Sequence, residues 1–280
     1  MKKISLIVLA VLLFLLLCIF SCGETFVNQA TFYPEKGSAV NIERLPPSIR
    51  HYIIPTDDGE QLSAFLFRAD SANKTILYFH GNAGNASGRL TWGQELASLH
   101  ANVLMLDYRG YGLSSGSPSE AGIYTDGRAA LNYLVNVLHA DPETLFLYGR
   151  SLGSAVAVEI ANDLPMAGLI LVTPISSGKQ VAENGGLGAL ASLIGNPFDN
   201  LKKFPQINLP ILILHGDQDE VLPLEMGQAL QAVAPARTQL MVIPGAGHNN
   251  IESINKVQFY QYIDTFCSAV LNIQLSEQDS

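Results

Sequence analysis

Six short apolar runs, separated by longer stretches of mixed polarity, constrain the fold of this chain more than any other feature. They occupy residues 76–79, 103–106, 145–148, 169–172, 211–214 and 240–243. Strands that are apolar on both faces and alternate with helices are typical of a parallel sheet covered on both sides. Ahead of them, residues 52–55 and 62–67 flank an Asp-Asp-Gly turn and predict a hairpin. We therefore predict an α/β fold, with a mostly parallel central sheet of about eight strands and helices on both faces.

The N-terminus has the composition of a bacterial export signal. Residues 1–21 contain Lys2 and Lys3 followed by a long apolar run, whose length fits a signal peptide better than a membrane span. Its end, Ile-Phe-Ser-Cys, is similar to the lipobox of bacterial lipoprotein signals, in which the cysteine is lipidated. We expect lipidation at Cys22 and an exported protein anchored to the membrane, on its periplasmic or extracellular face. An uncleaved anchor and ordinary secretion are the alternatives.

Beyond the leader, the chain divides into a short extension and one domain. Residues 22–48 lack clear periodicity and end near Pro46-Pro47, which predicts a tether or N-terminal extension. The predicted α/β domain covers residues 49–274, and residues 275–280 form a tail. Within the domain, the irregular segment at about 174–209 predicts a small cap.

Composition excludes several classes of partner and cofactor. The net charge is −9, and removal of the leader, which carries two lysines and no acids, makes it −11. Such a chain lacks the basic patch that nucleic acids require. Cys18 lies in the leader and Cys22 at its end, so Cys267 remains alone and no disulfide within the chain is expected. No cysteine or histidine spacing indicates a metal site, and we predict no cofactor.

One of the apolar runs leads directly into a candidate nucleophile. Residues 145–148 precede Gly-Arg-Ser-Leu-Gly at 149–153, and a helix of small residues follows. This strand–turn–helix pattern places Ser151 at the apex of the turn, with its hydroxyl beside a helix N-terminus. A second G-x-S-x-G match surrounds Ser114, but it does not directly follow a strand and a loop comes after it. We predict that Ser151 attacks an acyl carbon and that Ser114 is a loop serine.

Further candidate residues follow the other runs, where ligands bind in open α/β sheets. The first run is followed by a loop at residues 80–85 that is short of bulky side chains. Its backbone amides, from Asn82 or alternatively Ala83, can join the Leu152 amide in an oxyanion hole, which stabilises the negative charge of acyl transfer. We interpret His80 as a structural hydrogen-bonding residue beneath this loop.

A serine nucleophile needs a base, and the base needs an acid that fixes its tautomer. His248, on a glycine-rich loop after the last run, is the best candidate base. Asp217 and Asp219 lie on the loop after residues 211–214. We favour Asp219 as the acid, and Asp217 remains a loop-stabilising or alternative acid. The order Ser151, Asp219, His248 is the one that α/β-hydrolases use.

Taken together, these motifs resemble the α/β-hydrolase superfamily of serine hydrolases, and in particular its single-domain members with HGNAGN, DYRGYG and G-x-S-x-G motifs. The matching segments are residues 80–85, 107–112, 149–153, 215–223 and 245–248. The resemblance implies Ser151 as nucleophile, Asp219 as acid and His248 as base, with Asn82 and Leu152 as oxyanion donors. It also implies that Asp107, Tyr108 and Arg109 form a structural network that supports the oxyanion loop. Thr173-Pro174-Ile175 stands where eukaryotic relatives often have Ser-Pro-Phe, so their substrate preference is not carried over.

The sequence therefore predicts a serine esterase or thioesterase that acts on a small-molecule or lipid acyl ester without a cofactor. Two alternatives remain open. One is a serine peptidase or amidase of the same fold, although such peptidases usually carry a large additional domain. The other is a non-catalytic lipoprotein that uses the fold to bind a partner.

Overall fold

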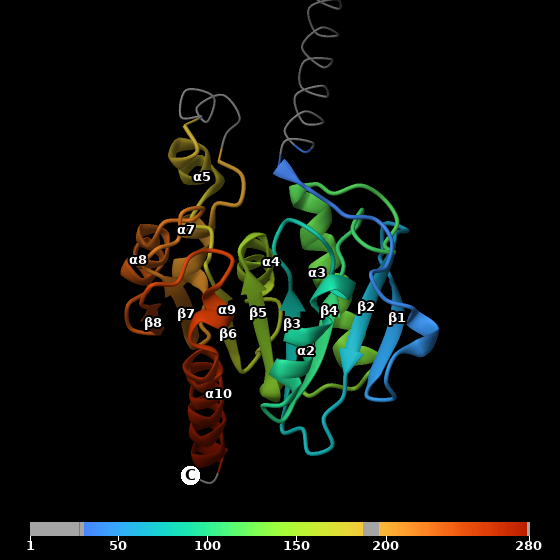
Figure 1. Cartoon of the computed structure of the whole chain (residues 1–280). Coiled ribbons are helices and arrows are strands. Elements are labelled where there is room, and N and C mark those ends of the chain that lie inside the picture. The colour runs from blue at the N-terminus through green and yellow to red at the C-terminus, as the bar shows by residue number, and fades with distance from the viewer. Residues whose placement is uncertain (1–27, 29–30, 187–195, 279–280) are drawn as a thin grey trace, which may run out of the picture. The chain divides into compact units, whose positions relative to one another are not determined.

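Eight strands form one sheet in the described part of the chain, which in this computed structural model comprises residues 28, 31–186 and 196–278. The spatial order is β1-β2-β4-β3-β5-β6-β7-β8 (Figure 1). Strand β2 runs antiparallel to both β1 and β4, and all the other pairs, from β4 to β8, are parallel. The strands are β1 (Ile49–Pro55), β2 (Gln61–Phe67), β3 (Lys74–Phe79), β4 (Ala101–Leu106), β5 (Leu145–Arg150), β6 (Gly168–Val172), β7 (Ile211–Gly216) and β8 (Thr238–Ile243). The predicted α/β fold and N-terminal hairpin are confirmed.

Helices cover both faces of this sheet. Helices α2 and α10 lie on one face, and α3, α4 and α8 lie on the other (Figure 1). The main helices are α2 (Leu90–Ala97), α3 (Glu120–Asn136), α4 (Leu152–Ile160), α8 (Leu224–Val233), α9 (Ile251–Ile254) and α10 (Lys256–Gln278). Short 3-10 turns lie at η1 (Ile42–Arg44), η2 (Ala86–Arg89), η3 (Pro142–Thr144) and η4 (Phe204–Gln206). Because α10 continues to Gln278, most of the expected tail at 275–280 is helical.

Side chains from both faces of the central strands are buried. Along β3, Ile76 and Tyr78 join the cluster beneath α2 and α10, while Leu77 and Phe79 are buried on the other side. This explains why the central runs are apolar at every position. The last strand, β8, is different, because it forms the edge of the sheet: Val242 is 38% exposed. We expected the apolar run at residues 240–243 to be buried on both faces. This prediction was wrong, because a strand at the edge of the sheet has a neighbouring strand on one side only.

The N-terminal segment is more closely attached than a tether. The chain separates into two compact units, and the second begins at Pro34 rather than at residue 49. In this second unit the Gly37 amide donates to the Gly112 carbonyl (2.8 Å), and Lys36 Nζ donates to the Ser114 carbonyl (3.1 Å). Residues 34–40, which we call the N-terminal strap, thus belong to the domain. The expected leader, including Cys22, lies outside the described residues.

The segment expected to form a cap follows β6. Its described parts hold α5 (Gly178–Asn184) and α7 (Asn200–Lys203), and α5 lies beyond the carboxyl ends of the strands (Figure 1). The Phe198 amide donates to Glu120 Oε1 (2.7 Å), which fastens the segment to the start of α3. Residues 187–195 of this segment lie outside the described residues.

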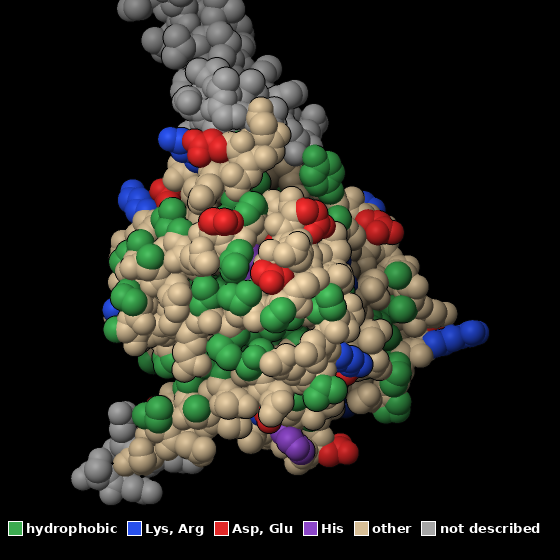
Figure 2. Space-filling model, turned by 60° about the vertical axis from the view of Figure 1, so that its left-hand side comes forward, with side chains coloured by type: hydrophobic (Ala, Val, Ile, Leu, Met, Phe, Trp, Pro, Cys, Tyr) green, Lys and Arg blue, Asp and Glu red, His purple; other side chains and the backbone are tan. Residues whose placement is uncertain are grey.

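The surface carries few cations on the face that Figure 2 shows, where Lys and Arg side chains lie apart from one another. Hydrophobic side chains are distributed over the same face in small groups between the backbone and polar atoms. Among the residues that the structure describes, we find no helix with the length and apolar character that crossing a membrane requires.

Candidate active site

Ser151 occupies a strained turn between β5 and α4. Its backbone angles are φ 52° and ψ −116°, a conformation that residues with a side chain rarely adopt. The Ser151 amide donates to the Val172 carbonyl (2.9 Å), and the Ser154 hydroxyl donates to the Ser151 carbonyl (2.6 Å). These bonds hold the turn in place, so the serine stands at the apex predicted from the sequence.

The two glycines beside Ser151 are required by close backbone contacts. A Cβ on Gly153 would lie 2.1 Å from the Phe79 carbonyl oxygen, and one on Gly149 would lie 2.6 Å from the Gly153 carbonyl oxygen. Neither backbone oxygen can move without shifting a strand or a helix. The G-x-S-x-G pattern is therefore a packing requirement here, because α4 approaches β3 and β5 through these glycines.

Replacing Gly153 with alanine is expected to destabilise the domain by about 1–3 kcal/mol, because the added methyl group overlaps the Phe79 carbonyl. Gly88→Ala is the matched control, since its nearest contact would be Asn85 Oδ1 at 3.9 Å. Urea unfolding of both variants checks the prediction. Equal midpoints for Gly153→Ala and wild type would contradict it.

Three parallel strands bring the predicted nucleophile, base and acid together. His248 Nε2 lies 3.1 Å from Ser151 Oγ, and His248 Nδ1 lies 2.9 Å from Asp219 Oδ2. All three residues follow the carboxyl ends of β5, β7 and β8. In the tautomer with the proton on Nδ1, the histidine donates to Asp219 and accepts from the serine hydroxyl. This arrangement can move a proton from Ser151 to His248.

Asp219 is held in an environment that favours its carboxylate form. The amides of Val221 and Leu222 donate to Oδ1 at 3.0 and 2.7 Å, and His215 Nε2 lies 3.5 Å from Oδ2. Burial alone would raise the pKa of Asp219, but hydrogen bonds from His215, His248 and the Leu222 amide outweigh it and place that pKa well below its usual range. Asp219 is thus an ionised partner for His248 at neutral pH.

Asp217 has a different contact from Asp219. Its Oδ1 accepts a hydrogen bond from the Gly245 amide (2.7 Å), at the start of the loop that carries His248. Of the two acids left open by the sequence, the geometry places Asp219 at the histidine and Asp217 at the backbone of the neighbouring loop.

The loop at residues 80–85 lies beside the serine. A Cβ on Gly81 would lie 3.4 Å from Ser151 Cβ. The Tyr108 hydroxyl donates to the His80 carbonyl (2.8 Å), and the Tyr111 hydroxyl donates to Asn82 Oδ1 (2.8 Å). Leu152 begins α4, where helix amides have no partner within the helix. The amides of Asn82 and Leu152 therefore come from two segments that meet at Ser151.

His80 and Asp107 stabilise the underside of this loop. His80 is fully buried, its Nδ1 lies 2.6 Å from the Gly81 carbonyl oxygen, and its Nε2 lies 3.4 Å from Asp107 Oδ1. Burial lowers the pKa of His80, which favours a neutral ring. Asp107 Oδ1 also accepts a hydrogen bond from the Ala86 amide (2.6 Å). These contacts give His80 the structural role that the sequence predicted.

Arg109 differs from the expectation that it supports the same loop. Its Nη1 donates to Asp58 Oδ2 (2.8 Å) and its Nε donates to Asp126 Oδ1 (2.9 Å). It therefore joins the hairpin turn before β2 to α3. Its side chain reaches carboxylates far apart in the sequence, which a local motif does not reveal.

Ser114 also bridges distant segments, since its hydroxyl accepts from the Ser63 amide and donates to the Asp107 carbonyl, both at 2.8 Å.

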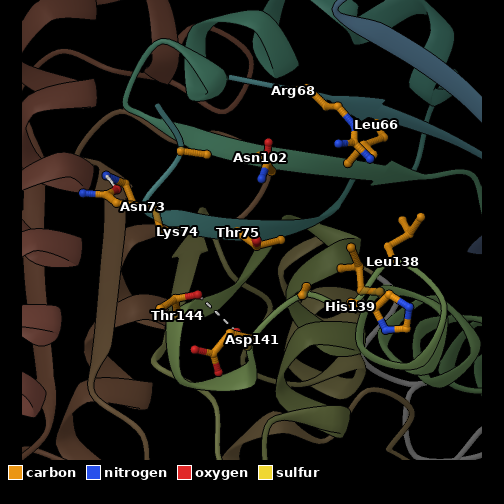
Figure 3. Close-up of a pocket in the computed structure, with 13 residues that line it drawn as sticks. Leu66, Arg68, Asn73, Lys74, Thr75, Asn102, Leu138, His139, Asp141 and Thr144 are labelled. Carbon is orange, nitrogen blue, oxygen red and sulfur yellow. Dashed lines mark hydrogen bonds between the residues drawn. The ribbon is translucent and has the colours of Figure 1, made fainter. Parts of the chain in front are cut away.

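The cavity in Figure 3 lies at the amino ends of the central strands, opposite to the end at which Ser151 lies. Figure 3 shows Thr75 at the start of β3, Asn102 at the start of β4 and Thr144 just before β5, all at the amino ends of parallel strands. Thr144 Oγ1 donates to the Asp141 carbonyl (3.2 Å), and Lys74 Nζ lies 3.3 Å from Asp264 Oδ1. The cavity is thus separate from Ser151.

Within the described ranges, no cluster of three or more His, Cys, Asp or Glu residues is arranged to hold a metal ion.

Comparison with known proteins identifies the family. An uncharacterized protein of Mycobacterium tuberculosis is 32% identical over 234 residues, which is 81% of this chain and 82% of that protein. The family described as Serine aminopeptidase, S33, matches residues 70–203. Alpha/beta hydrolase domain-containing protein 17C of Xenopus tropicalis is 33% identical over 199 residues, 70% of the chain and 63% of that protein. This chain belongs to the α/β-hydrolase superfamily.

Solved structures show the same fold. An esterase of Pyrococcus furiosus superposes on the α/β-hydrolase with a TM-score of 0.71 at 18% identity, covering 85% of this chain and 98% of that one. An alpha-beta hydrolase of Vibrio vulnificus superposes with a TM-score of 0.67 at 25% identity, covering 79% and 81%. At 18% identity, the likeness to the esterase shows the fold alone.

Three residues beside the site of the α/β-hydrolase were not identified from the sequence: Trp92, Arg150 and Glu252. Arg150 is charged and yet ends a strand whose residues are all buried. A buried arginine needs a carboxylate partner, so the arginine in an otherwise apolar strand was a sign in the sequence that an acid lies nearby. The sequence does not show which acid pairs with Arg150.

Proposed function

We propose that this α/β-hydrolase cleaves carboxylic ester or thioester bonds through an acyl-enzyme on Ser151. The observation that carries the proposal is the hydrogen-bonded series Ser151–His248–Asp219, with the serine on a strained turn. A nucleophile, a base and an ionised acid in this order are the parts that acyl transfer needs.

In the first half of the reaction, Ser151 Oγ forms a bond to the acyl carbon while its proton passes to His248 Nε2. Negative charge develops on the carbonyl oxygen, and the amides of Leu152 and Asn82 stabilise it. Each such donor contributes about 3 kcal/mol to transition-state stabilisation. The bond to the alcohol or thiol then breaks, and the leaving group takes the proton from His248.

In the second half, water replaces the leaving group. His248 Nε2 takes a proton from water as the water oxygen bonds to the acyl carbon. The bond to Ser151 Oγ then breaks, the serine recovers its proton from His248, and a carboxylic acid is released. Asp219 stays ionised throughout and stabilises the imidazolium that forms in each half. The cycle requires neither a metal nor an organic cofactor.

A second candidate function is hydrolysis of amide bonds, because the matched family is described as a serine aminopeptidase. Initial rates of the purified protein with p-nitrophenyl acyl esters, an acyl thioester and an aminoacyl p-nitroanilide distinguish the two. We expect turnover of the ester or thioester at a higher rate than the anilide. A faster reaction with the anilide would replace the ester assignment, and a folded protein that turns over none of them would favour a non-catalytic binding role.

We also propose that the protein is an exported lipoprotein anchored through Cys22, which would place the site near lipid acyl esters. The support is the basic and apolar leader that ends in a lipobox-like sequence. Expression in a bacterial host with a labelled fatty acid is expected to label wild type and Cys267→Ala, but not Cys22→Ser. Labelling of Cys22→Ser, or none of wild type, would contradict this proposal.

A further inference from the structure

Arg150 is a buried cation directly beside the nucleophile. It is 5% exposed and ends β5, and its Nε donates to Glu252 Oε1 at 2.6 Å. Glu252 is 6% exposed and lies in α9, which follows the loop of His248. A buried guanidinium costs several kcal/mol unless its donors are paired. Glu252 supplies the charge that makes this position tolerable.

The same guanidinium also contacts the loop that carries His248. Arg150 Nη2 donates to the backbone carbonyl of His248 at 2.9 Å. Because Arg150 and Ser151 are adjacent in the chain, this bond connects the backbone of the base to the backbone of the nucleophile. The imidazole must lie within hydrogen-bond distance of Ser151 Oγ to accept its proton. A fixed His248 backbone restricts where that ring can be.

A third contact of Arg150 is with the loop at residues 80–85, which we call the oxyanion loop because it carries the proposed donor Asn82. A Cβ on Gly81 would lie 3.2 Å from Arg150 Nη1, so the guanidinium packs against the backbone that leads to Asn82. The Arg150 side chain therefore contacts both the loop that leads to Asn82 and the loop that carries His248. Arg150 is also the residue directly before the nucleophile in the chain.

Trp92, the only tryptophan of the chain, lies beneath this arrangement. The Arg150 guanidinium carbon lies 5.2 Å from the centre of its ring, and that of Arg89 lies 5.7 Å from it. Arg89 in turn donates to the carbonyls of Asn85 (2.7 Å) and Ala83 in the oxyanion loop. The indole thus packs against two cations: Arg150, which bonds the His248 carbonyl, and Arg89, which bonds the loop at residues 80–85.

We propose that Arg150, anchored by Glu252 and supported by Trp92, is a positioning residue that aligns His248 and the oxyanion loop with Ser151. This inference rests on the proposed function. Only arginine can meet the geometry, because its planar group donates in several fixed directions at once, whereas a lysine ammonium is a point charge. Arg150→Lys keeps the charge and removes the fixed pattern of donors.

The first test measures the rate constant of labelling by a fluorophosphonate, which reports attack by the serine. Arg150→Lys is expected to react about 100-fold more slowly, since a small misplacement of catalytic groups costs about that much. On the best ester substrate, kcat should fall while KM changes by less than about threefold, as for an interaction used in the transition state. A role in stability alone would leave the labelling rate of the folded protein unchanged.

Arg109→Lys is the matched control, because Arg109 is also a buried arginine that pairs with carboxylates, but its hydrogen bonds join the hairpin turn to α3. It is expected to lose stability and to keep its labelling rate within about threefold. Emission from Trp92 should change in folded Arg150→Lys and stay the same in Arg109→Lys. Equal labelling rates for Arg150→Lys and wild type would overturn the inference.

Glu252→Gln decides the question if Arg150→Lys does not fold. It keeps an oxygen acceptor for Arg150 and removes the charge, and we expect labelling to slow by about tenfold. A wild-type rate in this variant would overturn the inference. Absence of an activated Ser151 gives a different result, because wild-type protein itself would then not be labelled, and a labelled protein that prefers the anilide would overturn the ester assignment alone.

Discussion

Ser151→Ala is expected to reduce ester hydrolysis by about 10⁴–10⁶-fold, because the variant has no oxygen to form the acyl-enzyme. Its free energy of unfolding should be close to that of wild type, or slightly higher if the strained turn relaxes. The measurement is kcat/KM on the best p-nitrophenyl ester, together with urea unfolding. A residual rate within tenfold of wild type would remove Ser151 from the mechanism.

The second G-x-S-x-G serine provides the control for this experiment. Ser114 is buried, and its hydroxyl joins the Ser63 amide to the Asp107 carbonyl. Ser114→Ala should therefore lower the free energy of unfolding by about 1–3 kcal/mol, because it leaves buried groups without a partner. The folded variant should keep most of its activity. The two serines thus separate a chemical role from a structural one within the same motif.

Asp219→Asn is expected to reduce kcat by about 10⁴-fold with little change in KM. The amide would offer His248 Nδ1 either a donor or a neutral acceptor, so the tautomer that accepts the serine proton is no longer favoured and the imidazolium is not stabilised. Steady-state kinetics on the same ester check this expectation. The labelling rate with a fluorophosphonate should fall in parallel.

Asp217→Asn is the matched control on the same loop. Its Oδ1 accepts only from the Gly245 amide among the hydrogen bonds found in the described residues, and an asparagine oxygen can replace it. We expect kcat within about threefold of wild type, because the contact lies outside the chemistry. A larger loss in Asp217→Asn than in Asp219→Asn would reverse the assignment of the acid.

The fold was predictable because its main signals are local. Each apolar run became a strand, since residues such as Leu77 and Tyr78 face opposite layers of helices and both must be apolar. The strained turn at Ser151 was also evident, because the glycines it needs lie beside it in the sequence. The sequence does not reveal which strand ends the sheet, so the exposure of Val242 was missed.

The parts that were missed depend on contacts between distant segments. The strap is held by backbone bonds such as Gly37 to Gly112, and by Asn85 and Ser87 side chains that bond to its backbone from a distant loop. The sequence favoured Asp219 but left Asp217 open, because the choice depends on a local turn in which the Val221 and Leu222 amides donate to Asp219 Oδ1 and His248 Nδ1 lies 2.9 Å from Oδ2. No periodicity encodes such a turn.

Arg109 and Arg150 illustrate the same limit for charges. Both lie in motifs recognisable in the sequence, yet their partners come from other elements: Asp58 and Asp126 for the first, Glu252 for the second. A motif predicts that a buried arginine needs an acid. Only the fold determines which acid is near, and hence whether the pair supports the hairpin or the site.

The central claim is that His248 and Asp219 activate Ser151 for attack on an acyl carbon. Reaction of the purified protein with a fluorophosphonate, followed by peptide mass spectrometry, tests it most directly. We predict a single adduct on the peptide that contains Ser151, and a much slower reaction in His248→Ala. An adduct on another serine, or none in a folded protein, would contradict the account.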